Sequence, residues 1–142
     1  MNRVRLDSKS EQSVLNMLLE NASINDKQIS KINSTSAEIG KSKLETAFEL
    51  NLTDEEKVVK LLAQTYSLEL VDLKEKKIDE KLKKILDVRF IENNFLVPFE
   101  IVGNILKIAI PDGSKLSLMK NLKTMTKMEP ELYAASISDI SS

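Results

Sequence analysis

The chain has 142 residues, 42% of them hydrophobic, which is enough for a buried core in one ordinary domain or in two very small ones. Its 21 basic and 22 acidic residues nearly cancel, which argues against nucleic acid as a partner because nucleic-acid-binding proteins usually carry a basic excess. Cysteine and histidine are absent, which excludes disulfides, thiolate metal sites and the commonest general base near neutral pH. No apolar run approaches the ~20 residues of a membrane-spanning helix, and no signal-peptide core is present, so we expect a cytoplasmic location.

The first half of the chain is predicted to contain a duplicated pair of helices. Residues 1–12 are polar and are predicted to form a flexible tail ahead of a helical subdomain over residues 13–69. Residues 15–32 align with residues 44–61 at a constant shift of 29 residues. The aligned apolar pairs are Leu15 with Leu44, Leu18 with Ala47, Leu19 with Phe48, Ile29 with Val58 and Ile32 with Leu61. This pattern predicts two helix-turn-helix units whose apolar faces pack on each other.

Local signals suggest where these helices begin and end. Asn25 or Asp26 is predicted to cap the second helix, and residues 33–43, rich in Ser, Thr, Asn and Gly, are predicted to form a loop. Thr53 is predicted to cap the fourth helix, because Glu56 stands three residues later as a capping box requires.

Residues 70–142 are predicted to form an α/β subdomain. A basic helix is predicted over residues 74–86, and residues 95–110 have the pattern of a β-hairpin that turns at Gly103 and Asn104. Ser114 is predicted to cap the next helix, which is followed by a third strand and by the start of a last helix. The predicted class is α+β, with helical hairpins followed by an α–β–β–α–β–α unit around a three-stranded, mainly antiparallel sheet.

No constellation of catalytic residues is visible. The acidic cluster of Asp54, Glu55 and Glu56 falls at a predicted helix N-terminus, where carboxylates stabilise the helix dipole. The sequence GKSK at residues 40–43 lacks the first glycine and the preceding strand of a phosphate-binding loop. We therefore expect no enzyme activity, no cofactor and no metal site in this chain.

The order of these elements resembles the N-terminal domain of type II secretion and type IV pilus assembly ATPases, the MshE-like N-terminal domain superfamily. The resemblance rests on LLAQTYSLELVDL at residues 61–73, followed in the family's order by KIDEKLKKIL, FLVPF, LKIAIPDGSKL and EPELYAAS. It covers roughly residues 13–142 and depends on apolar positions more than on diagnostic polar residues.

The resemblance implies a non-catalytic docking and regulatory domain. In the family, such a domain precedes a hexameric motor ATPase and binds the cytoplasmic part of an inner-membrane assembly protein. ATP and Mg²⁺ would then belong to a motor domain in cis, and the chain would lie at the inner face of the cytoplasmic membrane through its partners. The sequence does not distinguish a secretion system from a pilus system.

The family also includes domains that bind cyclic diguanylate, which is the alternative function. Their motif carries an Arg at the start of each repeat and a Gly before each second helix. Here the Arg positions are occupied by Ser13 and Ser42, and the Gly positions by Ala22 and Asn51. Because an Arg would contact the phosphates or a guanine, its absence argues against this ligand.

Two sets of residues are candidates for docking. Apolar residues of the helical half could form an exposed face, or could simply pack the repeats together; these are Met17, Leu18, Leu19, Ile32 and Phe48. Lysines of the charged stretch could bind an acidic partner, or could form an ordinary solvated surface; these are Lys76, Lys77, Lys81 and Lys84.

Overall fold

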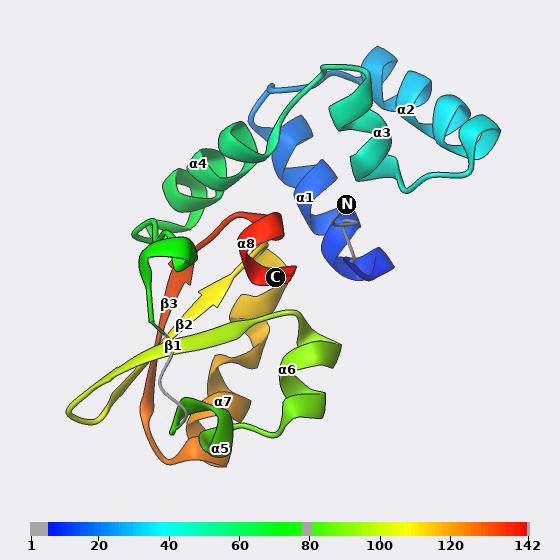
Figure 1. Ribbon diagram of the computed structural model, residues 1–142. Helices are drawn as coiled ribbons and strands as arrows, with labels where there is room; N and C mark the ends of the chain where they lie inside the picture. The colour runs from blue at the N-terminus through cyan, green and yellow to red at the C-terminus, as the bar shows by residue number, and fades with distance from the viewer. Residues whose placement is uncertain (1–5, 78–80, 142) are drawn as a thin grey trace.

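The computed structural model describes residues 6–77 and 81–141 and shows a helical half joined to a small α/β half (Figure 1). The helical half contains α1 (Ser8–Glu20), α2 (Asp26–Ile39), α3 (Lys43–Glu49) and α4 (Glu55–Tyr66). The α/β half contains the 3₁₀ helix η1 (Leu73–Glu75), α5 (Leu82–Ile85), α6 (Val88–Asn94), β1 (Val97–Val102), β2 (Ile105–Ile110), the 3₁₀ helix η2 (Gly113–Leu118), α7 (Met119–Thr126), β3 (Glu129–Ala134) and α8 (Ile137–Ser141). The predicted α+β class is confirmed.

The two helical units repeat each other hydrogen bond by hydrogen bond. In the turn between α1 and α2, the amide of Ser23 donates to the carbonyl of Leu18. In the turn between α3 and α4, the equivalent amide of Leu52, 29 residues later, donates to the carbonyl of Ala47. The second helix of each unit is capped in the same way. The side chain of Asn25 accepts from the amide of Gln28 at 2.8 Å, and that of Asp54 accepts from the amide of Lys57 at 2.9 Å. The duplication predicted from the sequence therefore describes the backbone itself.

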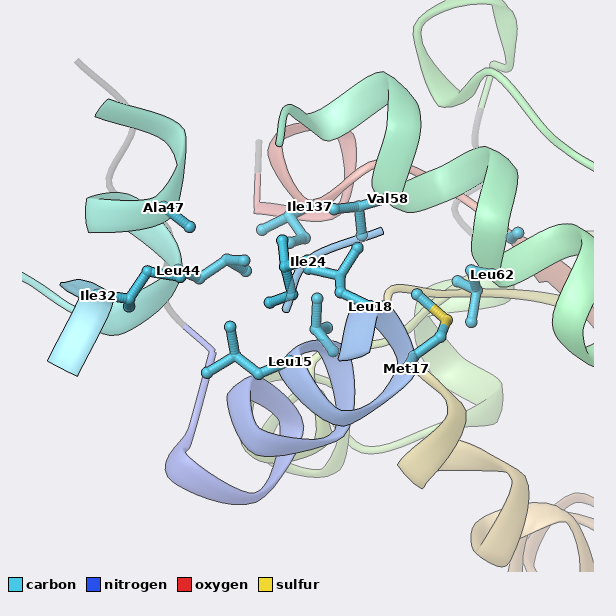
Figure 2. Packing of buried hydrophobic residues seen from close by; sticks show 12 residues of the cluster. Leu15, Met17, Leu18, Ile24, Ile32, Leu44, Ala47, Val58, Leu62 and Ile137 are labelled. Atoms are coloured by element: carbon cyan, nitrogen blue, oxygen red, sulfur yellow. The ribbon is translucent and has the colours of Figure 1, made fainter. Parts of the chain in front are cut away.

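Each helix of the first unit packs on a helix of the second unit. Helix α1 of the first unit contacts α4 of the second, and α2 of the first contacts α3 of the second. Figure 2 shows apolar side chains pointing towards one another, among them Leu15 and Leu18 of α1, Ile24 of the turn after α1, and Val58 of α4. Leu18, Ile32, Leu44 and Leu62 have no exposed surface. Burial of this shared apolar surface drives the units together.

The sheet has the order β1–β2–β3, with β1 antiparallel and β3 parallel to β2. The predicted hairpin is confirmed, and Gly103 at its turn has φ of +60°, a left-handed conformation that glycine adopts readily. Pro98 lies on the edge strand β1 next to a register shift, as its missing amide hydrogen requires.

The two faces of the sheet are covered differently. Alternate residues of β2, such as Leu106 and Ile108, pack on one face of the sheet with Leu82 of α5 and Leu122 of α7. On the other face, Phe99 and Tyr133 pack with Leu73 and Ile140. The first face carries most of the helices of the α/β half, and the second is covered by η1 and α8.

The two halves share one of their buried apolar clusters. Ala134 at the end of β3 and Ile137 of α8 belong to the same buried cluster as Val58 and Leu62 of α4. Leu70 forms a parallel bridge to Ala134 and so joins the chain leaving α4 to the edge of the sheet. The predicted boundary between residues 69 and 70 thus falls in the segment that pairs with the end of β3. The division into two subdomains at this point stays a prediction.

Several predicted boundaries were wrong. Helix α1 begins at Ser8, within the predicted tail, because Asp7 caps it; residues 1–5 of that tail lie outside the described residues. Helix α2 continues to Ile39 through the predicted loop, because a reciprocal capping box at Asn25 starts it and Gly40, with φ of +69°, ends it. Favourable helix ends outweigh the weak helix propensity of Ser, Thr and Asn.

Two predicted caps and one predicted helix are also corrected. Asp54, and not Thr53, caps α4, and Asp112, and not Ser114, caps η2, because the carboxylate in each case accepts the free amide. The predicted helix over residues 74–86 is replaced, in the part that the structure describes, by η1 and the short α5, and its Ile78 lies outside the described residues.

Candidate docking surfaces and cavity

The apolar docking candidates lie in the contact between the repeats. Met17, Leu18 and Ile32 are buried, and Leu19 and Phe48 are half-buried against the same cluster. Only the last two, which occupy equivalent positions in the two repeats, offer surface to a partner in this conformation. The partner-docking role of all five stays a prediction.

The basic candidates are all exposed. Lys76 and Lys77 follow η1, and Lys81 and Lys84 lie at the beginning and within the turn of α5. Figure 1 shows α5, with Lys81 and Lys84 at its start and within it, at the end of the sheet away from the helical half.

The two positions where the resemblance expects glycine have the same backbone conformation. Ala22 and Asn51 have φ of 58° and 57°, the left-handed conformation that glycine adopts most readily. Ser13 lies within α1, and Ser42 caps α3 by accepting from the amide of Glu45 at 3.1 Å. The two repeats thus have the same turn conformation, with serine at both positions where the resemblance expects arginine.

A cavity of about 480 Å³ lies where α1 faces the α/β half. It is lined by Lys9, Gln12, Ser13, Asn16, Met17, Glu20, Tyr66 and Ser114. Met17 and the ring of Tyr66 stand beside polar groups in this lining, so the cavity offers polar and apolar surface in similar proportion. Sequence reasoning identified Ser13 and missed the other polar lining residues. The available signal was the spacing of Lys9, Gln12, Asn16 and Glu20, which places them on one side of a helix.

Next to the cavity, a buried polar cluster joins α1 to η2. The Oδ1 atom of Asp112 accepts from the amide of Ser114 at 2.9 Å and from the Ser114 hydroxyl. The hydroxyls of Ser10 and Ser114 lie 3.5 Å apart. Within the described residues, the buried Oδ2 atom of Asp112 has no hydrogen-bond partner. Lys115 is also buried, so this contact between the halves concentrates polar groups away from solvent.

Two further contacts tie α4 to the α/β half. The carboxylate of Glu55 accepts from the amide of Ser138 at 2.9 Å and from the Ser138 hydroxyl, and so connects the first turn of α4 with α8. At the other end of α4, the ring of Tyr66 lies against the backbone of Gly113.

The resolved pKa shifts lie at the start of α1, on α4, where the hydrogen bond to Glu56 raises the pKa of Lys60, and on the sheet. The amide of Ser10 lowers the pKa of Asp7 below its usual value, and the positive charge of Lys115 adds to this effect. The hydrogen bond to Glu131 raises the pKa of Tyr133. Lys107, whose Nζ lies 5.5 Å from the centre of the Tyr133 ring, forms an ion pair with Glu100 at 3.1 Å.

Neither a metal site nor a membrane helix is found in the described part of the chain. Among residues 6–77 and 81–141, no three acidic side chains are grouped as a metal ion would require. Over the same residues, no helix has the length and hydrophobicity needed to cross a bilayer.

The comparisons with known proteins agree with this architecture. The structure of MshE with cdg has a TM-score of 0.64 and 20% identity, covering 89% of this chain and 92% of that one. Two crystal forms of the N-terminal domain of XpsE have TM-scores of 0.56 and 0.64 at 21% identity; they cover 99% and 95% of this chain, and 95% and 94% of theirs. At such low identity these likenesses establish the fold.

No curated protein sequence matches the chain. The family model described as the MshEN domain matches residues 66–142, which include the end of α4 and the whole α/β half. This match spans more than half of the chain, and it shows that the protein belongs to the MshEN domain family.

Proposed function

We propose that this chain is the non-catalytic docking and regulatory N-terminal domain of a secretion or pilus assembly ATPase. Its partner would be the cytoplasmic part of an inner-membrane assembly protein, and ATP and Mg²⁺ would bind to a motor domain in cis. The observation that carries the proposal is the MshEN match over residues 66–142 together with the likeness to the N-terminal domain of XpsE. A cytoplasmic location at the inner face of the membrane, and a hexameric full-length protein, belong to the same proposal.

The shape of the chain supports a docking role. The helical half contacts the α/β half through α1, which packs on η2, and through α4, which packs on β3, whereas α2 has only Ile32 buried and packs on α3. The buried Val58 of α4 corresponds to the apolar Ile29 of α2, whereas the buried Leu62 of α4 corresponds to the exposed, polar Asn33. The repeat is therefore asymmetric, with one side bound to the sheet and the other available to a partner.

The test is a calorimetric titration of the chain with the cytoplasmic domains of inner-membrane assembly proteins from the same genome. Saturable binding to one of them is expected. The Lys76→Gln, Lys77→Gln variant should weaken that binding if the acidic-partner surface is correct. The matched control is Lys27→Gln, Lys31→Gln, which removes the same charge from exposed positions of α2. Absence of binding to every such domain would refute the proposal.

A sensor of cyclic diguanylate is the second candidate function. The fold is shared with a structure of MshE with cdg, which we take to be cyclic diguanylate, and a cavity lies beside Ser13 at the first motif position. The serines at both arginine positions weigh against it.

Titration of the purified chain with cyclic diguanylate distinguishes the two functions. We expect no saturable heat from the natural chain, because Ser13 and Ser42 cannot make the bidentate contacts of arginine. Saturable micromolar binding would replace the docking proposal by the sensor. A Ser13→Arg, Ser42→Arg variant serves as the control, since restored binding would show that the repeat keeps the required shape.

A further inference from the structure

The contact of α1 with η2 is the polar side of the joint between the two halves. Five polar or charged residues are buried in the described part of the chain, and three of them, Ser10, Asp112 and Lys115, belong to α1 or to η2 and its cap. The Ser10 amide and, more weakly, the charge of Lys115 lower the pKa of Asp7, which places Lys115 near the start of α1. Polar groups are therefore gathered where α1 meets η2, whereas burial normally selects apolar side chains.

The interactions that the structure describes across this contact are weak. The hydroxyls of Ser10 and Ser114 lie 3.5 Å apart, which is long for a hydrogen bond between hydroxyl groups. Asp112 accepts its hydrogen bonds from Ser114 in its own turn, so these bonds survive a separation of η2 from α1. The buried Oδ2 atom of Asp112 has no partner within the described residues. Separation would therefore return Asp112 and Lys115 to water at the loss of few interactions.

The cavity of about 480 Å³ adds to this weakness. It lies between α1 and η2, with Lys9 and Gln12 on one wall and Ser114 on the other. Side chains that line a cavity lack neighbours on one side and so lose part of the attraction that a close-packed contact provides. The joint is thus incompletely packed on the side where its polar groups are buried.

The contact of α4 with β3 and α8 is of the opposite kind. Val58 of α4 shares a buried apolar cluster with Ala134 of β3 and Ile137 of α8. Leu70, on the chain that leaves α4, forms a bridge with Ala134 whose two backbone hydrogen bonds measure 2.8 and 3.0 Å. Figure 1 shows α4 over the end of β3, with α1 beside α4. Apolar burial and backbone pairing therefore hold this side of the joint together.

We propose that the two halves open at the contact of α1 with η2 and pivot on the contact of α4 with β3 and α8. The helical half moves as one body, because the apolar cluster that holds α1 on α4 includes the fully buried Leu18. The joint is a hinge with a polar closing side, and its opening exposes Ser10, Asp112 and Lys115 to solvent. This inference goes beyond the proposed function, because it concerns a change of shape that needs no partner.

Thiol labelling of the chain measures this opening, because the natural sequence contains no cysteine. The Ser10→Cys variant places a thiol in the contact of α1 with η2. The control Thr46→Cys places one inside the helical half, where Thr46 is as fully buried as Ser10. Both substitutions change the side-chain volume little, so both variants are expected to fold.

The two thiols should differ in reactivity towards an aromatic disulfide reagent under native conditions. We expect Ser10→Cys to react at least about 100-fold faster than Thr46→Cys, because its exposure needs only the opening of the hinge. Its rate should change little at low urea, where little surface is exposed by the opening. The rate of Thr46→Cys should rise steeply with urea, because that thiol is exposed only by global unfolding.

Two further variants separate hinge opening from other motions. Val58→Cys places a thiol on the pivot side and should react about as slowly as Thr46→Cys, since the pivot stays closed. Gly113→Ala crowds the ring of Tyr66 against η2 and should speed the labelling of Ser10→Cys by about fivefold. Fraying of the first turn of α1 would also expose residue 10, but it leaves Tyr66 in place and would not respond to Gly113→Ala.

Three results would overturn the proposal. The first is an equal rate with equal urea dependence for Ser10→Cys and Thr46→Cys, which would mean that no separate opening occurs. The second is a Val58→Cys thiol as reactive as Ser10→Cys, which would mean that the halves separate completely. The third is fast labelling of Ser10→Cys that ignores Gly113→Ala, which would assign the reaction to fraying of α1. Because no partner protein is present, failure here leaves the proposed docking function unaffected.

Discussion

The ring of Tyr66 lies so close to Gly113 that a β-carbon at residue 113 would overlap it. Tyr66 is the last residue of α4, and Gly113 is the first of η2, so this contact joins the helical half to the α/β half. The absence of a side chain at Gly113 is what allows the contact.

Gly113→Ala should therefore loosen the contact between the halves. The ring is the free end of a side chain and can swing away, so we expect a loss of about 1–2 kcal/mol of unfolding free energy. Urea denaturation measures it. In the Tyr66→Ala background the same substitution should cost much less, and an equal cost in both backgrounds would show that Tyr66 is not the cause.

Glu55→Ala should release α8 from α4. The carboxylate accepts two hydrogen bonds from Ser138, and bonds to a charged acceptor are worth about 1.5–3 kcal/mol. Amide hydrogen exchange in α8 should become faster, with a smaller effect from Ser138→Ala. The neighbouring Glu56→Ala is the control, because the ion pair of Glu56 with Lys60 is exposed and its loss should change little. Unchanged exchange in α8 after Glu55→Ala would contradict the expectation.

Ala22→Gly should stabilise the protein by about 1 kcal/mol. Ala22 has φ of 58°, where a β-carbon is strained and glycine is not. Asn51→Gly at the equivalent turn should give a smaller gain, because asparagine tolerates this conformation better than alanine. Urea unfolding compares the two variants with Ala37→Gly, inside α2, which should cost about 1 kcal/mol. A loss of stability in Ala22→Gly would rule out the strain.

Asp7 should make the stability of α1 depend on pH. The Ser10 amide lowers its folded-state pKa below the ordinary value of 3.8. Its contribution is complete above 3.8 and is lost as the pH falls through the lower folded-state pKa. In Asp7→Asn the cap remains but does not titrate. The difference in unfolding temperature between the natural chain and Asp7→Asn should therefore shrink on acidification, and a constant difference would contradict this reasoning.

Leu18→Ala should cost about 2–5 kcal/mol, because Leu18 is fully buried between the repeats. Leu19→Ala should cost less, since its side chain keeps some exposure. Denaturant unfolding measures the loss of stability in both variants. A docking candidate can be tested by mutation in binding experiments only if its variant stays folded. If the two costs were equal, Leu19 would also belong to the core.

Part of the candidate site followed from the sequence and part did not. The repeated spacing of Leu15 and Leu44 identified the duplicated unit, because a helix must bury the same side in both copies. The cavity did not follow, because Tyr66 and Ser114 reach it from segments 48 residues apart in the chain. Helix ends were mispredicted where a carboxylate replaced a hydroxyl as the cap, as at Asp54 and Asp112.

The α+β class, the duplication and the hairpin at Gly103 follow from the sequence alone, since each depends on local periodicity and turn chemistry. The burial of Met17, Leu18 and Ile32 in the core does not follow from it and is seen only in the folded chain. An apolar stripe on a helix has the same spacing whether it meets a neighbouring helix or a partner protein. Which of the two covers it depends on contacts between residues distant in the chain, and the packing of α1 on α4 supplies that contact here.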